Sequence, residues 1–172
     1  MKYLQLILLM TLLGIYGCGS QSPAERAKSL ISQGKTSEAA DIYREILLKN
    51  EDSDDLTQRM KALNAALCLA NCLMKLQSYP EAADAFDETI QLADSINKET
   101  PGYTPLAVFA DFYRFKAKAH KLAGNMDLAR ESAEKSVEID QEMSRQLQAI
   151  KDFEKMIRTN PLGQESEGAN RE

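Results

Sequence analysis

Residues 27–47 read AKSLISQGKTSEAADIYREIL, and their pattern recurs without gaps at residues 70–90 and at residues 117–137. Apolar residues three and four positions apart, on both sides of a polar break, predict two helices joined by a tight turn near Gly34, Ser78 and Gly124. Six columns align: Ala27/Ala70/Ala117, Leu30/Leu73/His120, Gly34/Gln77/Gly124, Ala39/Ala82/Ala129, Tyr43/Phe86/Ala133 and Leu47/Ile90/Val137. We therefore expect an all-α chain with three helix–turn–helix units.

Small residues in the fourth column predict that the two helices of each unit cross closely. Side chains larger than those of Ala39, Ala82 and Ala129 would hold the helix axes apart. Tyr43 and Phe86 lie four residues later on the same helical face. This combination resembles the tetratricopeptide repeat over about residues 24–140. The resemblance implies about three stacked repeats in a short right-handed superhelix, and a plain helical bundle is the alternative.

The units are longer than the roughly 34 residues of that family. The alanines of the fourth column are 43 and 47 residues apart. The extra residues fall at 50–55 and 100–105, which predicts longer second helices and longer loops. Neither Gly nor Pro occurs from residue 128 to residue 160, so we expect one long helix or two helices bent near Asp140. Residues 141–158 are expected to cap the open end of the stack, and residues 160–172 to form a disordered polar tail.

The first 18 residues, MKYLQLILLMTLLGIYGC, place an apolar run after a single Lys. That run is shorter than the roughly 20 apolar residues of a membrane span and fits an export signal. Its end, Ile15-Tyr16-Gly17-Cys18, resembles a bacterial lipobox. The resemblance implies a signal peptide at residues 1–17 and fatty acids on Cys18. An ordinary cleaved signal and a short uncleaved anchor are the alternatives.

A lipid on Cys18 predicts localisation in the cell envelope, because two or more acyl chains anchor a protein stably. In enteric lipoproteins, Asp after the lipid-bearing Cys retains the protein in the inner membrane. Gly19 therefore implies the outer membrane, facing the periplasm. Residues 18–24 are expected to form a short lipidated tether, and residues 25–159 the repeat domain with its C-terminal capping helix.

Net charge excludes nucleic acid as the main partner. The chain carries −5 at pH 7, and loss of Lys2 with the signal peptide makes this −6. Nucleic-acid binding needs a concentrated basic face, which this balance does not provide.

No catalytic pattern stands out. Cys68 and Cys72 lie four apart on one expected helix, which predicts two buried thiols or a strained disulfide in an oxidising compartment. His120 occupies a column otherwise held by Leu, so we expect it to be packed in the core. The chain has no Gly-rich phosphate loop, and two thiols with one distant His cannot complete four metal ligands. We therefore expect no enzyme, no metal and no cofactor besides the lipid on Cys18.

A basic stripe on the third unit is the candidate binding site. Arg114, Lys118 and Lys121 lie at i, i+4 and i+7, and the equivalent positions of the earlier units hold Lys28, Asn64, Asn71 and Lys75. In tetratricopeptide domains this stripe lines a concave groove that binds peptides. The resemblance implies capture of an acidic peptide or of a C-terminal carboxylate. A solvated groove, and a partner docking elsewhere, are the alternatives.

These patterns together predict a membrane-tethered adaptor or scaffold that recruits an envelope protein. The alternative function is a structural or regulatory subunit of an envelope complex. Such a subunit would dock through its convex face or through residues 141–158.

Overall fold

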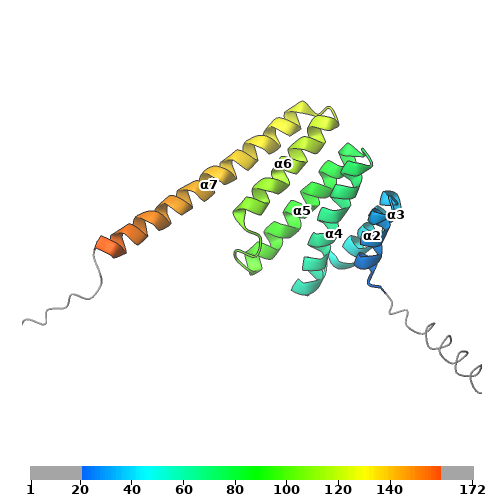
Figure 1. The fold of residues 1–172 in the computed structure, drawn as a ribbon, viewed down its shortest axis with the longest axis horizontal. Helices are drawn as coiled ribbons and strands as arrows, with labels where there is room; N and C mark the ends of the chain where they lie inside the picture. The colour runs from blue at the N-terminus through cyan, green and yellow to red at the C-terminus, as the bar shows by residue number, and fades with distance from the viewer. Residues whose placement is uncertain (1–20, 160–172) are drawn as a thin grey trace, which may run out of the picture. The chain divides into compact units, whose positions relative to one another are not determined.

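The computed structural model describes residues 21–159, and every regular element in that range is a helix. In chain order these are α2 Pro23–Ser32, α3 Thr36–Asn50, α4 Leu56–Lys75, α5 Tyr79–Glu99, α6 Leu106–Leu122 and α7 Met126–Thr159 (Figure 1). The all-α prediction is confirmed. Cys18, the predicted signal peptide at residues 1–17 and the predicted tail at residues 160–172 lie outside the described residues.

The chain divides into two units, Met1–Leu92 and Ala93–Glu172, and the boundary falls within α5. In the first unit α2 packs on α3 and α3 packs on α4, whereas in the second unit α6 packs on α7. Fully buried side chains mark the core of each unit, among them Phe86 in the first and Ile96 in the second.

The first helix begins two residues before the domain limit predicted at residue 25. The Ser22 hydroxyl accepts the Glu25 N–H at 3.3 Å, and the Glu25 carboxylate accepts the Ser22 N–H at 2.9 Å. This capping box satisfies two N–H groups that the first turn of a helix leaves without partners. Pro23 suits the first turn because its φ is fixed and it has no N–H to satisfy. Pro23 and Ala24, which the sequence assigned to the tether, therefore belong to α2.

The three turns inside the helix pairs share one geometry. Each contains a residue with positive φ from the same aligned column: Gly34 at 77°, Gln77 at 62° and Gly124 at 86°. In each, the next N–H donates to the carbonyl five residues earlier, in the pairs Lys35–Leu30 at 2.9 Å, Ser78–Leu73 at 3.0 Å and Asn125–His120 at 2.9 Å. This hydrogen bond is typical of a helix whose last turn is followed by a residue in the left-handed backbone conformation. The second turn is centred on Gln77, one residue before the predicted Ser78.

Apart from the turn column, the aligned columns are buried in the first two helix pairs and less so in the third. The first- and fourth-column alanines of those two pairs are completely buried, namely Ala27, Ala39, Ala70 and Ala82. On α7 the fourth-column Ala129 is buried, with 8% of its surface exposed. Ala133, by contrast, is exposed, and Val137 is 51% exposed. The outer face of α7 therefore lacks the cover that α4 gives to α3.

Longer loops occur where the sequence placed its extra residues, at 51–55 between α3 and α4 and at 100–105 between α5 and α6. The second loop is held by Asn97. Its amide donates to the Thr104 carbonyl at 2.9 Å, and its oxygen accepts the Thr104 N–H at 2.7 Å.

The last helix is continuous, so the alternative of two helices bent near Asp140 is wrong. It has 34 residues against 17 in α6. At about 1.5 Å per residue, α6 can cover only half of it. The C-terminal half of α7 extends past α6 (Figure 1), and the side chains of residues 143–156 are exposed. The sequence led us to expect a cap at residues 141–158, but over residues 143–156 this part of the helix covers no core.

Candidate interaction surfaces

The predicted groove residues of the first unit are exposed, as a binding surface requires. Asn64, Asn71 and Lys75 lie at i, i+7 and i+11 on α4, and Lys28 is exposed on α2. The Asn64 amide donates to the Met60 carbonyl at 3.0 Å, and the Asn71 amide donates to the Leu67 carbonyl at 2.9 Å. Each amide keeps its oxygen and a second N–H for a ligand. This pair of groups suits a peptide backbone, which also offers one donor and one acceptor.

Arg114 on α6 is engaged by two carboxylates. Its guanidinium contacts Asp111 one turn earlier and Asp140 on α7, each with an N–O distance of 2.5 Å. The hydrogen bond to Asp140, followed by that to Asp111, raises the pKa of Arg114. In the sequence, Asp140 was only an interruption of an apolar pattern. The sequence gives no sign of its pairing with a residue 26 positions away, because that pairing depends on how α6 and α7 pack.

Lys118 and Lys121 keep their predicted exposed positions on α6. Within the described part of the chain neither forms an ion pair. Of the predicted basic stripe, these two lysines therefore carry the charge that an acidic ligand could neutralise. Arg114 instead links α6 to α7.

The predicted groove residues belong to both units. Lys28, Asn64, Asn71 and Lys75 lie in the first and Arg114, Lys118 and Lys121 in the second. A single groove that joins the two sets stays a prediction.

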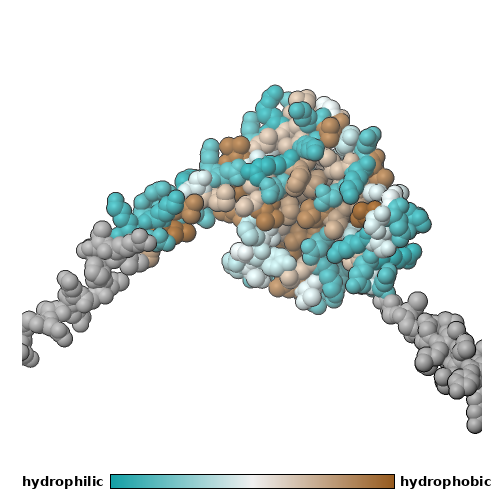
Figure 2. Space-filling view, viewed as in Figure 1, coloured by the Kyte–Doolittle hydropathy of each residue, from teal (hydrophilic) through white to brown (hydrophobic). Residues whose placement is uncertain are grey.

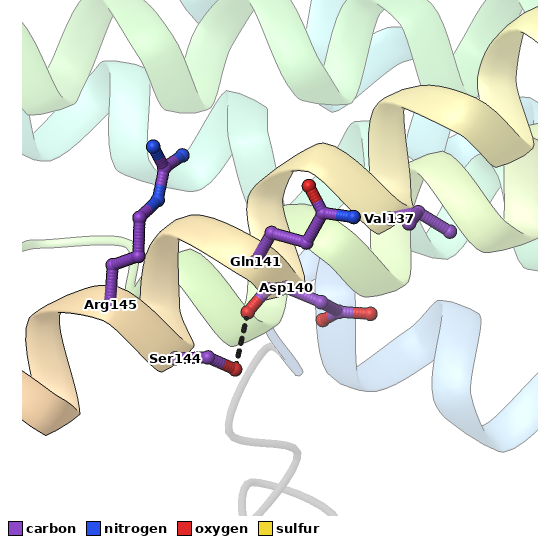
Figure 3. Close-up of a pocket in the computed structure, with 5 residues that line it drawn as sticks. All are labelled: Val137, Asp140, Gln141, Ser144 and Arg145. Atoms are coloured by element: carbon purple, nitrogen blue, oxygen red, sulfur yellow. Dashed lines mark hydrogen bonds between the residues drawn. The ribbon is translucent and has the colours of Figure 1, made fainter.

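A shallow depression beside α7 adjoins the Arg114–Asp140 ion pair. Its lining comes from α7 alone and consists of Val137, Asp140, Gln141, Ser144 and Arg145 (Figure 3). The Ser144 hydroxyl donates to the Asp140 carbonyl at 2.9 Å. A single helix cannot enclose a small molecule, since such sites bury most of their ligand between several elements.

A carboxyl pair that the sequence did not indicate lies in the first unit. Glu88 on α5 and Glu51, directly after α3, share a hydrogen bond beside Asp52, Gln91 and Leu92. Burial, then the hydrogen bond and charge of Glu51, raise the pKa of Glu88 to about 7. Two carboxyls can share a hydrogen bond only while one of them keeps its proton. The pair therefore takes up a proton near neutral pH.

The two thiols of α4 lie against Tyr43 of α3. Both cysteines are free, with Cys72 buried and Cys68 partly exposed, so the structure has the thiol form and no disulfide. Burial, followed by the charge of Cys68 and its hydrogen bond, raises the pKa of Tyr43 to about 12. Burial also raises the pKa of Cys72. A raised thiol pKa lowers the thiolate fraction, so Cys72 is a poor nucleophile and acts as a packing residue.

His120 is a core residue, as predicted, with 7% of its surface exposed. Its Nδ1 atom is buried without a hydrogen-bond partner among the described residues. In the same part of the chain, no group of three or more His, Cys, Asp or Glu side chains could hold a metal ion.

Residues 21–159 include no helix with the length and apolar character needed to cross a membrane. No protein-family model matches the chain, and no curated protein shows significant similarity to it.

Proposed function

We propose that this protein is a lipid-anchored envelope adaptor, tethered through Cys18, whose tetratricopeptide-like repeats bind another envelope protein. The shared geometry of the three turns is the observation that carries the repeat assignment. Gly34, Gln77 and Gly124 have the same left-handed backbone and the same closing hydrogen bond in the same alignment column. A left-handed residue ends many unrelated helices, so the recurrence of this turn in one alignment column, between helices of matching pattern, is what supports a repeated unit.

The contact between α3 and α4 supports stacking of one repeat on the next. Tyr43 is 3% exposed and its hydroxyl contacts Cys68 of the following helix. In a repeat array each unit buries its face against its neighbour, which exposes the polar faces of the first helices for binding. On these faces lie Asn64, Asn71 and Lys75 in the first unit and Lys118 and Lys121 in the second.

The proposed ligand is an acidic segment of an envelope protein. Lys118 and Lys121 would form charge-assisted hydrogen bonds with its carboxylates, and their charge would speed encounter with an acidic partner. The Asn amides of α4 would bind peptide backbone. Arg114 has a supporting role, because its charge is already shared by Asp111 and Asp140.

Charge reversal tests this adaptor function. Lys118→Glu with Lys121→Glu should abolish capture of the proteins that the wild-type chain retains from envelope extract, while helical content stays unchanged. The matched control is Arg130→Glu with Lys135→Glu. It changes the net charge equally in the same unit, at exposed residues of α7 whose ion pairs contribute little. Equal loss of capture in the two variants, or retained capture in the first, would contradict binding at this stripe.

The anchor is tested separately at Cys18. Cys18→Ser removes the acylated thiol, so fatty-acid labelling should disappear and the protein should leave the membrane fraction or remain unprocessed. Cys68→Ser is the control, because it removes a thiol from the folded domain and should leave labelling intact. Acyl label that persists in Cys18→Ser would disprove lipidation at this residue.

A further inference from the structure

Two thiols and a phenol form a cluster between α3 and α4 that the proposed function does not use. Cys68 and Cys72 lie four residues apart on α4, so they share one face of the helix. The charge of Cys68 acts on both Cys72 and Tyr43, which places the three side chains together. Cys72 and Tyr43 are 2% and 3% exposed, whereas Cys68 is partly exposed and opens the cluster to solvent.

The geometry of a helix favours a bound ion over a disulfide at this pair. Residues four apart have Cβ atoms about 5–6 Å apart, whereas a disulfide needs about 3.5–4.5 Å. Two bonds of about 2.3 Å from sulfur to a metal let the sulfur atoms lie up to about 4.6 Å apart. In a disulfide the two sulfur atoms must approach to about 2.05 Å. The pair can therefore hold an ion without distortion of α4.

Two ligands are enough for a soft monovalent cation. Zinc takes four ligands, and the described residues contain no group of three or more His, Cys, Asp or Glu side chains that could hold a metal. Cu(I), by contrast, is selected by soft thiolates, and two of them can hold it. Mg²⁺ and Ca²⁺ need several oxygen ligands, of which this cluster offers only the Tyr43 hydroxyl. The donor set therefore suits a thiophilic ion of low coordination number.

The neighbouring groups suit the negative charge that two thiolates and one monovalent cation leave. Burial, then the charge of Cys68 and its hydrogen bond, raise the pKa of Tyr43. The hydrogen bond thus favours the protonated phenol, so the hydroxyl is the donor and can equally donate to a thiolate. Burial and Cys68 raise the pKa of Cys72, and the charge of Lys75, three residues later, lowers it. Tyr43 and Lys75 would both stabilise an anionic complex.

We propose that Cys68 and Cys72 bind one thiophilic monovalent cation of the Cu(I) class between their sulfur atoms. One cation enters, two thiol protons leave, and the complex carries a single negative charge with no change of oxidation state. Cys72 is a packing residue while it keeps its proton, but coordination deprotonates a thiol outright. The site belongs to the first unit alone. It depends neither on the proposed anchor nor on the proposed peptide groove.

Competition for Cu(I) tests the site. The full chain would carry Cys18→Ser, so that Cys68 and Cys72 are its only cysteines, and would be purified under nitrogen with a reductant that contains no thiol. We expect this parent chain to withdraw one Cu(I) per molecule from bathocuproine disulfonate, and the bound ion to protect both thiols from alkylation. Tyr43→Phe keeps the ring and removes the donor, so the affinity for Cu(I) should fall about 10-fold.

A variant with the same number of thiols controls for spacing. Cys68→Ser with Asn64→Cys leaves two thiols on α4 that are eight residues, or about 12 Å, apart. That distance is too long for one ion to bridge, so this variant should leave Cu(I) with the chelator. Both changed positions are at least partly exposed, so its circular dichroism should match that of the parent chain.

Equal retention of Cu(I) by the parent chain and the spaced variant would overturn the site, since binding would then not need paired thiols. Failure of the parent chain to withdraw Cu(I) from the chelator would overturn it as well. So would one ion for every two molecules, because the sulfur atoms of two copies would then share the ion.

Discussion

At the scale of single residues, the carboxyl pair of Glu88 and Glu51 makes stability depend on pH. The pKa of Glu88 rises from an ordinary value of 4.5 to about 7 in the folded chain. Below about pH 4.5 both folded and unfolded chains keep this proton, so the contribution to stability is fully present. Between about 4.5 and about 7 the unfolded chain releases the proton more readily, so stability falls. After allowance for solvent screening, the loss is on the order of 1 kcal/mol.

Glu88→Gln should remove this pH dependence, because Gln keeps a hydrogen-bond donor to Glu51 and does not titrate. We expect urea unfolding to show a smaller fall in the free energy of unfolding between pH 4.5 and pH 7.5 than in the wild type. Glu45→Gln removes an exposed carboxylate of α3 and should leave the fall unchanged. If the free energy of unfolding falls as much in Glu88→Gln as in the wild type and in Glu45→Gln, the shared proton does not contribute to stability.

Gln77 is the one departure from glycine in its column, and its φ of 62° lies in the left-handed region. A side chain disfavours that region by about 1–2 kcal/mol, part of which is offset by the greater freedom of Gly in the unfolded chain. Gln77→Gly should therefore raise the free energy of unfolding by about 0.5–1 kcal/mol.

Gly34→Ala is the reverse change in the equivalent turn. An added Cβ would meet no atom within 4 Å, so only the backbone conformation opposes it. Thermal unfolding should show a lower midpoint for Gly34→Ala and a higher midpoint for Gln77→Gly. Shifts of the same sign in the two variants would show that the turns are not equivalent.

At the scale of helices, close crossing depends on the fourth column of the repeat. Ala82 is completely buried, so Ala82→Leu would force a larger side chain into a filled space and should cost about 1–3 kcal/mol. Ala133→Leu makes the same change at an exposed position of α7 and should be nearly neutral. Chemical denaturation of both variants tests this, and equal stabilities would argue against the crossing at Ala82.

The helix pairs, their turns and the longer loops could be predicted because each has a local cause in the sequence. Apolar spacing gives the helices, and Gly34 and Gly124 supply two of the three left-handed turn residues. Asn97 illustrates what could not be predicted, since its two bonds to Thr104 require the loop to fold back first. Pairings between helices, such as Arg114 with Asp140, likewise follow from packing, which periodicity does not specify.

At the scale of the whole molecule, charge and apolar surface are distributed unevenly along α7. Its first half is acidic and packs on α6, whereas the side chains of its second half are exposed, including the apolar ones of Met143, Leu147, Ile150 and Phe153. Figure 2 shows hydrophobic surface among hydrophilic residues on this end of α7. The sequence predicted a long helix here but assigned its end to a cap. The apolar spacing of this part of α7 is the same whether the helix caps a core or stands free, and it stands free because α6 has 17 residues against 34 in α7.

Removal of the C-terminal half of α7 tests whether the rest of the domain is stable without it. A chain that ends at residue 142 keeps Asp140 and the part of α7 that packs on α6, so its thermal midpoint should stay within a few degrees of the full chain. A loss of 1 kcal/mol would already lower the midpoint by about 2–4 °C in a protein of this size. The helical circular dichroism signal should fall by the contribution of the missing half helix.

A chain ending at residue 125 is the control, because it also loses the partner of α6 and should be strongly destabilised. If truncation at residue 142 destabilised the protein as strongly, the C-terminal half of α7 would be packed against the domain and would contribute to its stability.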